Sequence, residues 1–393
     1  MKVLVLSRSM GEGHNRAALA VSEALAARGH TCETLDALRL LNFDERELHG
    51  RAARKAQRRE HTHRSGSDIA SAAYGWAAFK APALFGAVYT AGEVVCRAPF
   101  PSPVYLQNQK YAAETWAYIE DRRFDVVIST HTFPLETMSA IRKRYPSKVR
   151  YYGVLTDYTP TPFFAEAALD GYFIGHPDLM RKCRRAGLPE AITYPTGIPI
   201  SRRFHRPTNA DEKAKVRLGL GLPPDVPIFL LMSGGVGSQN APATCDHLLA
   251  EGGEKVHVVI MTGRRTDFYK STTARYQLDA RVSVIPFTER VPEYMTAADV
   301  ILSKPGGVSS TEAAVSGVPL IHTAAIPGCE TKNAQFFSTH GMSLYNQRPT
   351  EAARLACWLL DDRAKVASML SHQAANIPLG AADRVVDRLE GPT

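Results

Sequence analysis

The chain lacks the segments that mark secreted and metal-rich proteins. Its first residues, MKVLVLSRSM, have no basic stretch, long apolar run or small-residue cleavage site, so we expect no signal peptide and a mature protein that begins at Met1. Its six cysteines lie far apart, without the spacing of a metal site or a disulfide module. This cysteine usage is typical of a protein from a reducing cytoplasm.

One glycine of a dinucleotide-binding fingerprint is also missing. Gly11-Glu12-Gly13-His14 directly follows an opening apolar strand, but Arg16 stands where the fingerprint has its third glycine. A second glycine loop, SGGVGS at residues 233–238, follows a later strand. A nicotinamide-dependent dehydrogenase would leave that second loop unexplained, so this class is disfavoured.

What is present predicts a two-domain α/β protein. A chain of 393 residues exceeds what one hydrophobic core usually supports. Short runs rich in Val and Ile alternate with helical stretches, beginning with a helix at about residues 15–28, and this pattern indicates doubly wound parallel sheets. The expected strands are residues 2–7, 31–37, 125–130, 149–156 and 171–175 in a first block, and 227–235, 257–263, 282–287, 300–303 and 319–323 in a second.

A linker rich in proline is expected between the two blocks. Residues 195–208 carry three prolines, a glycine and basic residues, and this composition predicts domains at residues 1–198 and 199–393. Residues 350–389 are expected to be helical and to cover the second sheet, and the last helix is a candidate to pack back on the N-terminal domain. Because ligands bind beyond the carboxyl ends of such strands, we expect the two domains to face each other across a cleft.

The segment at residues 300–337 has the layout of an anion site. A strand leads into the loop Lys304-Pro305-Gly306-Gly307, whose glycines allow a ligand to approach the backbone. Ser309 and Ser310 follow where a helix is expected to open, with its free N–H groups pointing outward. The sequence therefore predicts a diphosphate site here.

The net charge of +8 includes a basic run at residues 51–64, followed by an apolar stretch with almost no charge at residues 69–96. A solvated helix face is one interpretation of the basic run. Lys80 and Pro82 break the apolar stretch into pieces that are too short to cross a bilayer. A basic segment beside such a stretch favours an interfacial membrane contact instead. Nucleic-acid binding is disfavoured, because basic residues interleaved with stacking aromatics are missing. The proposed contacts are Arg54, Lys55, Arg58, Arg59, Trp76, Phe79 and Phe85.

Several segments resemble the glycosyltransferases that add a sugar to diacylglycerol, namely the monogalactosyldiacylglycerol synthases and the processive diacylglycerol glucosyltransferases. More distantly they resemble the N-acetylglucosaminyltransferase of peptidoglycan assembly. The similar segments are residues 7–20, DVVISTHTFP at 125–134, VLTDY at 154–158, 233–238 and 287–337. The resemblance implies a GT-B fold, a nucleotide-diphosphate sugar as donor, inversion at the anomeric carbon, and no metal or other cofactor.

The resemblance also implies roles on the donor side. Gly234, Gly235, Ser309 and Ser310 would donate hydrogen bonds to the diphosphate of a UDP-sugar. Glu312, expected in the first turn of its helix, would bind the ribose hydroxyls, although complementing the helix dipole is the plainer alternative. The segment from Phe287 to Val291 would bind uracil through its main chain.

A turn at residues 327–333 is expected to face the donor sugar. Glu330 and Asn333 match the family pattern there, with turn capping as the alternative. Cys329 stands where the lipid glycosyltransferases usually have glutamine, so the resemblance does not imply which sugar is transferred.

On the acceptor side, His14 is the candidate base that takes the proton of the acceptor hydroxyl. We expect the loop between strand and helix to hold it, and a capping or packing role is the alternative. Asp157 is the other candidate, as base or as the group that orients His14. Gly13 and His131 are expected to line the acceptor side. Residues 159–164, TPTPFF, differ from the histidine and tryptophan that relatives tend to carry.

The sequence thus predicts hexosyl transfer from a UDP-sugar to a membrane lipid such as diacylglycerol or a glycosyl-diacylglycerol. The protein is expected in the cytoplasm, on the inner face of the cell membrane. Three alternatives stay open: a glycosyltransferase with a soluble or different lipid acceptor, a GT-B nucleotide-sugar epimerase, and a nucleotide-sugar-binding protein without catalysis.

Overall fold

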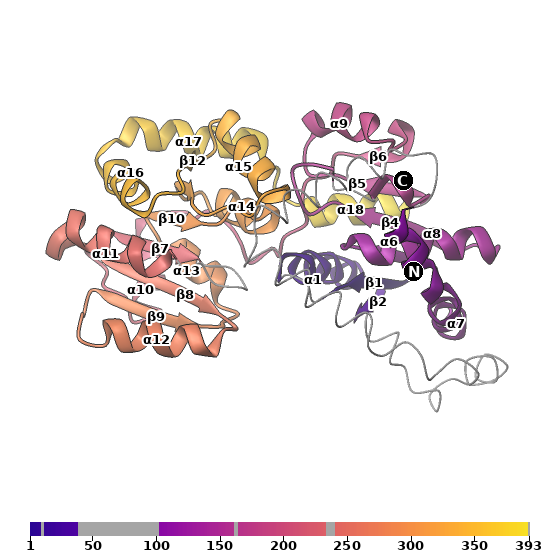
Figure 1. Cartoon of the computed structure of the whole chain (residues 1–393), viewed down its shortest axis with the longest axis horizontal. Helices are drawn as coiled ribbons and strands as arrows, with labels where there is room; N and C mark the ends of the chain where they lie inside the picture. The colour runs from indigo at the N-terminus through magenta and orange to yellow at the C-terminus, as the bar shows by residue number, and fades with distance from the viewer. Residues whose placement is uncertain (9–11, 38–101, 161–163, 233–239, 392–393) are drawn as a thin grey trace. The chain divides into compact units, whose positions relative to one another are not determined.

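The computed structural model describes residues 1–8, 12–37, 102–160, 164–232 and 240–391 (Figure 1). The chain divides into two compact units, and the described part of each is built around one six-stranded parallel sheet. Unit 1 comprises residues 1–201, 326–329 and 380–393, and unit 2 comprises residues 202–325 and 330–379. The predicted doubly wound α/β architecture is confirmed.

In unit 1 the strand order is β2-β1-β3-β4-β5-β6, with every neighbouring pair parallel. Val3 and Leu4 face opposite sides of β1, and both are fully buried because helices cover each face. The strands are β1 (Lys2–Ser7), β2 (Thr31–Asp36), β3 (Val126–Ser129), β4 (Arg150–Val154), β5 (Gly171–Phe173) and β6 (Thr193–Tyr194).

Two helices from opposite ends of the chain cover one face of this sheet. α1 (Glu12–Ala27) contributes Val21 and Leu25, and α18 (Ala381–Glu390) contributes Val385 and Leu389 to the same core as the strands. Arg28 Nη1 donates to Glu390 Oε2 over 2.9 Å and ties the two helices together. Residues 350–389 therefore do not all cover the second sheet, because α18 buries its apolar face in unit 1.

On the other side of the unit 1 sheet, α8 (Thr132–Arg144) packs against β3 and β4, and α7 (Ala112–Arg122) packs against α8. Two shorter helices complete the named elements of this unit, α6 (Pro103–Asn108) and α9 (Met180–Arg185).

In unit 2 the strand order is β12-β11-β10-β7-β8-β9, again parallel throughout. The strands are β7 (Ile228–Met232), β8 (His257–Gly263), β9 (Val282–Pro286), β10 (Val300–Ser303), β11 (Leu320–His322) and β12 (Leu344–Tyr345). The short strands β6 and β12 have only two residues each, and the sequence pattern does not predict either of them.

Helices cover both faces of the second sheet as well (Figure 1). α11 (Ala241–Gly252) and α16 (Pro349–Asp361) pack against each other and share one core with β7, β8 and β10. The remaining helices are α10 (Ala210–Gly219), α12 (Thr266–Tyr276), α13 (Val291–Ala297), α14 (Gly307–Val315), α15 (Cys329–Thr339) and α17 (Arg363–Asn376). Among the residues that the structure describes, no helix combines the length and the apolar character needed to cross a bilayer.

Each sheet has one point at which the chain changes direction across it. In unit 1 this switch lies between β1 and β3, and in unit 2 it lies between β7 and β10. Ligands of open α/β sheets bind beyond the carboxyl ends of the strands at this point. The loops that follow these four strands are therefore where the candidate sites belong.

Candidate functional site

His14 lies at the switch point of unit 1. It occupies the first turn of α1, not the preceding loop as predicted, because the helix already begins at Glu12. Its Nδ1 lies 2.7 Å from the carbonyl oxygen of Thr130, which directly follows β3. The Thr130 hydroxyl in turn donates to the carbonyl oxygen of His14 over 2.9 Å. The ends of β1 and β3 are thus joined through this histidine.

These contacts define which nitrogen of His14 can accept a proton. A carbonyl oxygen only accepts hydrogen bonds, so Nδ1 must carry the proton and donate it to Thr130. The hydroxyl oxygen of Thr156 lies 3.0 Å from the same nitrogen. In the neutral imidazole the lone pair is then on Nε2, which is the atom able to act as a base.

The charge state of His14 is set by opposing influences. Burial lowers the pKa of His14 below its ordinary value, while the negative charge of Asp157 and the hydrogen bond to Thr130 raise it. Burial is the larger influence, so the imidazole is neutral at pH 7. A neutral imidazole with a carboxylate nearby is suited to take a proton, because the carboxylate stabilises the imidazolium that forms.

His131 stands beside His14 in the opposite tautomer. It caps the N-terminus of α8, where the N–H of Phe133 donates to His131 Nδ1 over 3.2 Å, so the neutral ring carries its proton on Nε2. The two ring centroids are 4.6 Å apart with an interplanar angle of 70°. Burial, then the charges of His14 and Arg8, hold the pKa of His131 well below its ordinary value. The neutral His131 ring therefore donates from Nε2, whereas the neutral His14 ring has its lone pair on Nε2.

Three residues of this cluster were not predicted as site residues. Thr130 and Thr156 contact His14 directly, and the buried guanidinium of Arg8 lies 4.5 Å from the centroid of the Phe133 ring. Arg8 and Thr130 directly follow β1 and β3, and Thr156 lies two residues beyond β4. Position at the carboxyl end of a strand was the sequence signal that could have identified them.

In unit 2, α14 begins at Gly307 immediately after the Lys304-Pro305-Gly306 loop that follows β10. The first N–H groups of a helix have no acceptor within the helix and can bind a ligand. The Ser310 N–H is not one of these free groups, because it already donates to the carbonyl oxygen of Gly306 over 2.9 Å. The Ser310 hydroxyl is buried against His322 Nε2 at 2.9 Å. The Ser309 hydroxyl donates to the Gly306 carbonyl oxygen over 3.2 Å. The geometry therefore favours the main-chain N–H of Ser309 over Ser310 as a donor to a diphosphate.

Glu312 lies one turn further along α14 than predicted. The helix begins two residues before Ser309, so Glu312 falls in its second turn, and its side chain is almost fully buried. Complementing the helix dipole is an effect of the first turn, so this position weakens that alternative interpretation.

The loop before α14 is held by α15. Glu330 forms an ion pair with Lys304, and the Asn333 side-chain amide donates to the carbonyl oxygen of Pro305 over 3.1 Å. The predicted turn at residues 327–333 is in part helix, since α15 begins at Cys329. Asn333 is fully buried, so its amide fixes the shape of the loop. The sequence prediction named Glu330 and Asn333 as site residues but not Lys304, the partner of Glu330.

Phe287 and Val291 lie beyond the end of β9. The Phe287 ring is partly exposed, and the guanidinium carbon of Arg264 lies 3.6 Å from its centroid. Val291 is buried at the start of α13. Gly234, Gly235 and the seven predicted membrane contacts lie outside the described residues: Arg54, Lys55, Arg58, Arg59, Trp76, Phe79 and Phe85.

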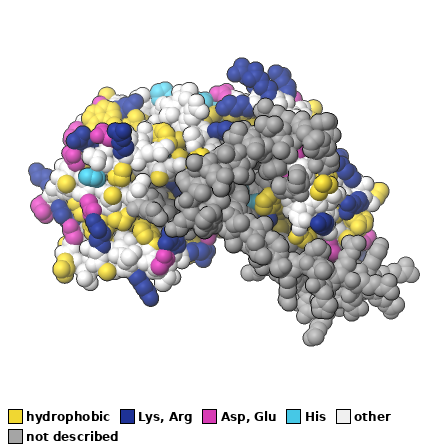
Figure 2. Space-filling view, in the orientation of Figure 1, with side chains coloured by type: hydrophobic (Ala, Val, Ile, Leu, Met, Phe, Trp, Pro, Cys, Tyr) yellow, Lys and Arg dark blue, Asp and Glu magenta, His cyan; other side chains and the backbone are white. Residues whose placement is uncertain are grey.

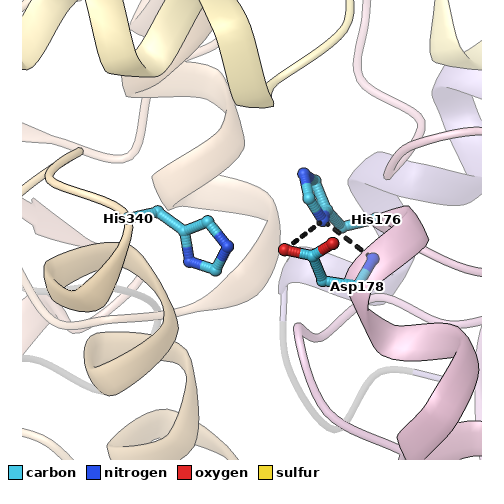
Figure 3. Close-up of side chains that lie close together, drawn as sticks. All are labelled: His176, Asp178 and His340. Carbon is cyan, nitrogen blue, oxygen red and sulfur yellow. Dashed lines mark hydrogen bonds and ion pairs between the residues drawn. The ribbon is translucent and has the colours of Figure 1, made fainter.

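His176 and Asp178 of unit 1 form a capped turn, and their side chains are drawn in Figure 3. The Asp178 N–H donates to His176 Nδ1 over 3.1 Å, and an Asp178 carboxylate oxygen lies 3.7 Å from the same nitrogen. His340 uses its own Nδ1 on the Phe336 carbonyl oxygen at 2.8 Å. Each imidazole thus has a local structural role in its own unit.

Comparison with known proteins agrees with the resemblance. Residues 77–200 match the family model for monogalactosyldiacylglycerol (MGDG) synthase, and residues 231–384 match the glycosyltransferase family 28 C-terminal domain. Together the two models match more than half of the chain. Residues 77–200 belong to the MGDG synthase family, and residues 231–384 belong to the family of glycosyltransferase 28 C-terminal domains.

A processive diacylglycerol beta-glucosyltransferase of Bacillus licheniformis is 29% identical to this chain over 258 residues. The alignment covers 63% of this chain and 66% of the relative. The matched segment spans slightly less than two thirds of that relative's length.

Two solved structures share the fold. MurG of Acinetobacter baumannii aligns with a TM-score of 0.62 at 16% identity, covering 100% of this chain and 99% of MurG. HepE of Anabaena, solved with UDP and glucose, aligns with a TM-score of 0.58 at 13% identity, covering 100% of both chains. The predicted GT-B fold is confirmed by these similarities.

Proposed function

We propose that this protein is an inverting, metal-independent glycosyltransferase that moves a hexose from a UDP-sugar to a hydroxyl of diacylglycerol or a glycosyl-diacylglycerol. The family assignment supports the reaction class. The name of the Bacillus licheniformis relative supports diacylglycerol as the acceptor.

The observation that carries the proposal is the tautomer of His14. Because Nδ1 is engaged with Thr130, Nε2 is the atom that receives the proton of the acceptor hydroxyl. The acceptor oxygen then forms a bond to C1 of the sugar as the bond from C1 to the diphosphate oxygen breaks. UDP leaves with the electrons of that bond. A single displacement of this kind inverts the configuration at C1.

The charge that develops on the leaving diphosphate needs stabilisation without a metal. The first-turn N–H groups of α14 and the positive end of its dipole supply fixed donors for this charge. The Lys304 ammonium, paired with Glu330, lies in the loop that precedes the helix. Glu312 is proposed to bind the ribose hydroxyls, and Glu330 to bind the sugar. Phe287 and Val291 are proposed to flank the uracil ring of the nucleotide.

The acceptor is proposed to be reached from the cytoplasmic face of a membrane. Arg181, Lys182 and Arg184 of α9 are exposed, and Figure 2 shows dark-blue side chains gathered where α9 lies in Figure 1. Basic side chains near an anionic leaflet contribute about 1 kcal/mol each to binding. The charges of α9 would add to the membrane attraction of the basic run at residues 51–64.

The proposed reaction is tested by its product. Purified protein is incubated with total lipid extract and a panel of UDP-sugars, and glycosylated products are identified by mass. We expect one UDP-sugar to yield a hexosyl-diacylglycerol of inverted configuration, with no loss of rate in EDTA. UDP release without a lipid product would contradict the lipid acceptor and indicate a soluble one. Conversion of the UDP-sugar to its epimer would contradict the transferase assignment.

The membrane contact is tested by sedimentation with vesicles that contain anionic lipid. A variant with Arg54, Lys55, Arg58 and Arg59 all changed to Gln is expected to lose binding, since each charge contributes about 1 kcal/mol. The matched control removes four exposed charges from unit 2 by changing Lys215, Lys255, Lys270 and Arg363 to Gln. Equal sedimentation of the two variants would refute a defined contact.

A further inference from the structure

Three buried polar side chains of unit 2 are linked by hydrogen bonds in a row. Ser310 of α14 places its hydroxyl 2.9 Å from His322 Nε2, and Ser343 places its hydroxyl 3.1 Å from His322 Nδ1. All three side chains are at most 4% exposed. His322 ends β11, and Ser343 directly precedes β12. These hydrogen bonds therefore join one helix to two neighbouring strands.

The imidazole of His322 is neutral and does not take up protons near pH 7. Complete burial lowers its pKa to about 3. One ring nitrogen then donates to a hydroxyl and the other accepts from one, so both nitrogens are used. The ring also meets the Phe337 ring edge-on, with centroids 5.4 Å apart. The arrangement is suited to holding neighbours in place and is unsuited to general base catalysis.

These hydrogen bonds hold α14, the helix that carries the proposed diphosphate site. Ser310 is the fourth residue of α14, one position after Ser309, so its contact to His322 fixes the rotation of the first turn against β11. From the other side, Asn333 and Glu330 hold the loop that leads into the helix. The backbone donors of the first turn can stabilise a diphosphate only when their direction is fixed in advance.

We propose that His322 is a positioning residue that sets the orientation of the α14 N-terminus for the diphosphate of the nucleotide donor, acting through Ser310 and Ser343. The inference rests on the proposed function. It predicts that loss of the imidazole weakens nucleotide binding, although His322 touches no part of the nucleotide.

The chain offers a matched control in the same unit. His257 Nε2 lies 2.9 Å from the Ser283 hydroxyl, and His257 is only 6% exposed, so it forms a comparable buried pair. It begins β8, at the opposite end of the strands from the switch point. A merely structural histidine and a positioning histidine can therefore be compared directly.

The experiment measures UDP binding by calorimetry, together with kcat and KM for the UDP-sugar and the melting temperature. The variants are His322→Leu, His322→Gln and His257→Leu. We expect both Leu variants to melt at lower temperature. Only His322→Leu should weaken UDP binding and raise KM, by about 10- to 100-fold, which is the scale of a small misplacement of a binding group. His322→Gln should recover part of the loss, because its amide both donates and accepts.

Unchanged UDP binding by folded His322→Leu, or equal weakening by His257→Leu, would overturn the inference. If His322→Leu fails to fold, Ser343→Ala keeps the ring and removes one partner, and unchanged UDP binding by that variant would overturn it instead. Failure of the proposed function would appear differently, because the unaltered protein would then bind no UDP.

Discussion

Each unit places a histidine near the carboxyl ends of its strands, a half-buried one in unit 1 and a fully buried one in unit 2, and the surroundings give the two rings different chemistry. Burial lowers the pKa of both His14 and His322. Only His14 has a nearby carboxylate, Asp157, and a backbone carbonyl that oppose this effect, and its Nδ1 contacts leave the lone pair on Nε2. His322 uses both nitrogens on hydroxyls. The same side chain is therefore suited to act as a base in unit 1, as we propose for His14, and as a positioning group in unit 2, as we propose for His322.

The proposed difference between His14 and His322 is tested most strongly by removing the imidazole of His14. His14→Ala is expected to lower kcat by about 10²- to 10⁴-fold, the usual contribution of general base catalysis. UDP binding should stay unchanged, because His14 belongs to unit 1 and the nucleotide is proposed to bind unit 2. The measurements are steady-state rates and UDP calorimetry, with circular dichroism as the control for folding. Unchanged turnover by the folded variant would refute the base assignment.

A smaller effect is expected from Asp157→Asn. The carboxylate stabilises the imidazolium of His14, so its loss lowers the pKa of His14 further and makes it a weaker base. The acid limb of the profile of kcat/KM against pH should move to lower pH, and the maximal rate should fall by about tenfold. A shift of the acid limb to higher pH would contradict the proposed influence of Asp157.

An effect on stability, and not on rate, is expected for unit 2 at acid pH. His322 has a pKa of about 3 when folded, and an unfolded histidine titrates near 6.5, so only the unfolded state gains this proton in between. The stability that His322 contributes is complete above about pH 6.5 and falls by up to about 1.4 kcal/mol per pH unit below it. The loss is complete near the folded pKa.

Calorimetric unfolding of unaltered protein and His322→Gln between pH 7 and pH 5 tests this slope. The stability difference between the two proteins should narrow as the pH falls, because the variant lacks the titrating ring. A constant difference would show that His322 is not the source of the pH dependence.

The strand pattern could be predicted from the sequence, while the placement of several side chains could not. Runs such as residues 257–263 and 300–303 are buried on both faces and read directly as strands. β6 and β12 escaped prediction, because a two-residue strand has no periodicity to detect.

The candidate site was predicted in part. His14, Glu312, Glu330 and Asn333 were identified by residue type and resemblance, but three of their local assignments were wrong. His14 lies in a helix and not in a loop, Glu312 lies in the second helical turn, and Glu330 lies in the first turn of α15 and not in a turn between elements. Helix starts depend on capping and packing partners that are distant in the sequence, so their boundaries are the weakest part of a pattern.

By itself the sequence determined the two parallel sheets, the loops at their switch points and the family, because these follow from local apolar runs, glycines and short motifs. Only the tertiary structure decided the tautomers of His14 and His131, the ion pair of Lys304 with Glu330, and the hydrogen bonds of His322. The hydrogen bond that fixes His14 joins residues that lie 116 positions apart in the chain. The acidity and direction of a buried side chain depend on such distant partners, and spacing along the chain does not specify them.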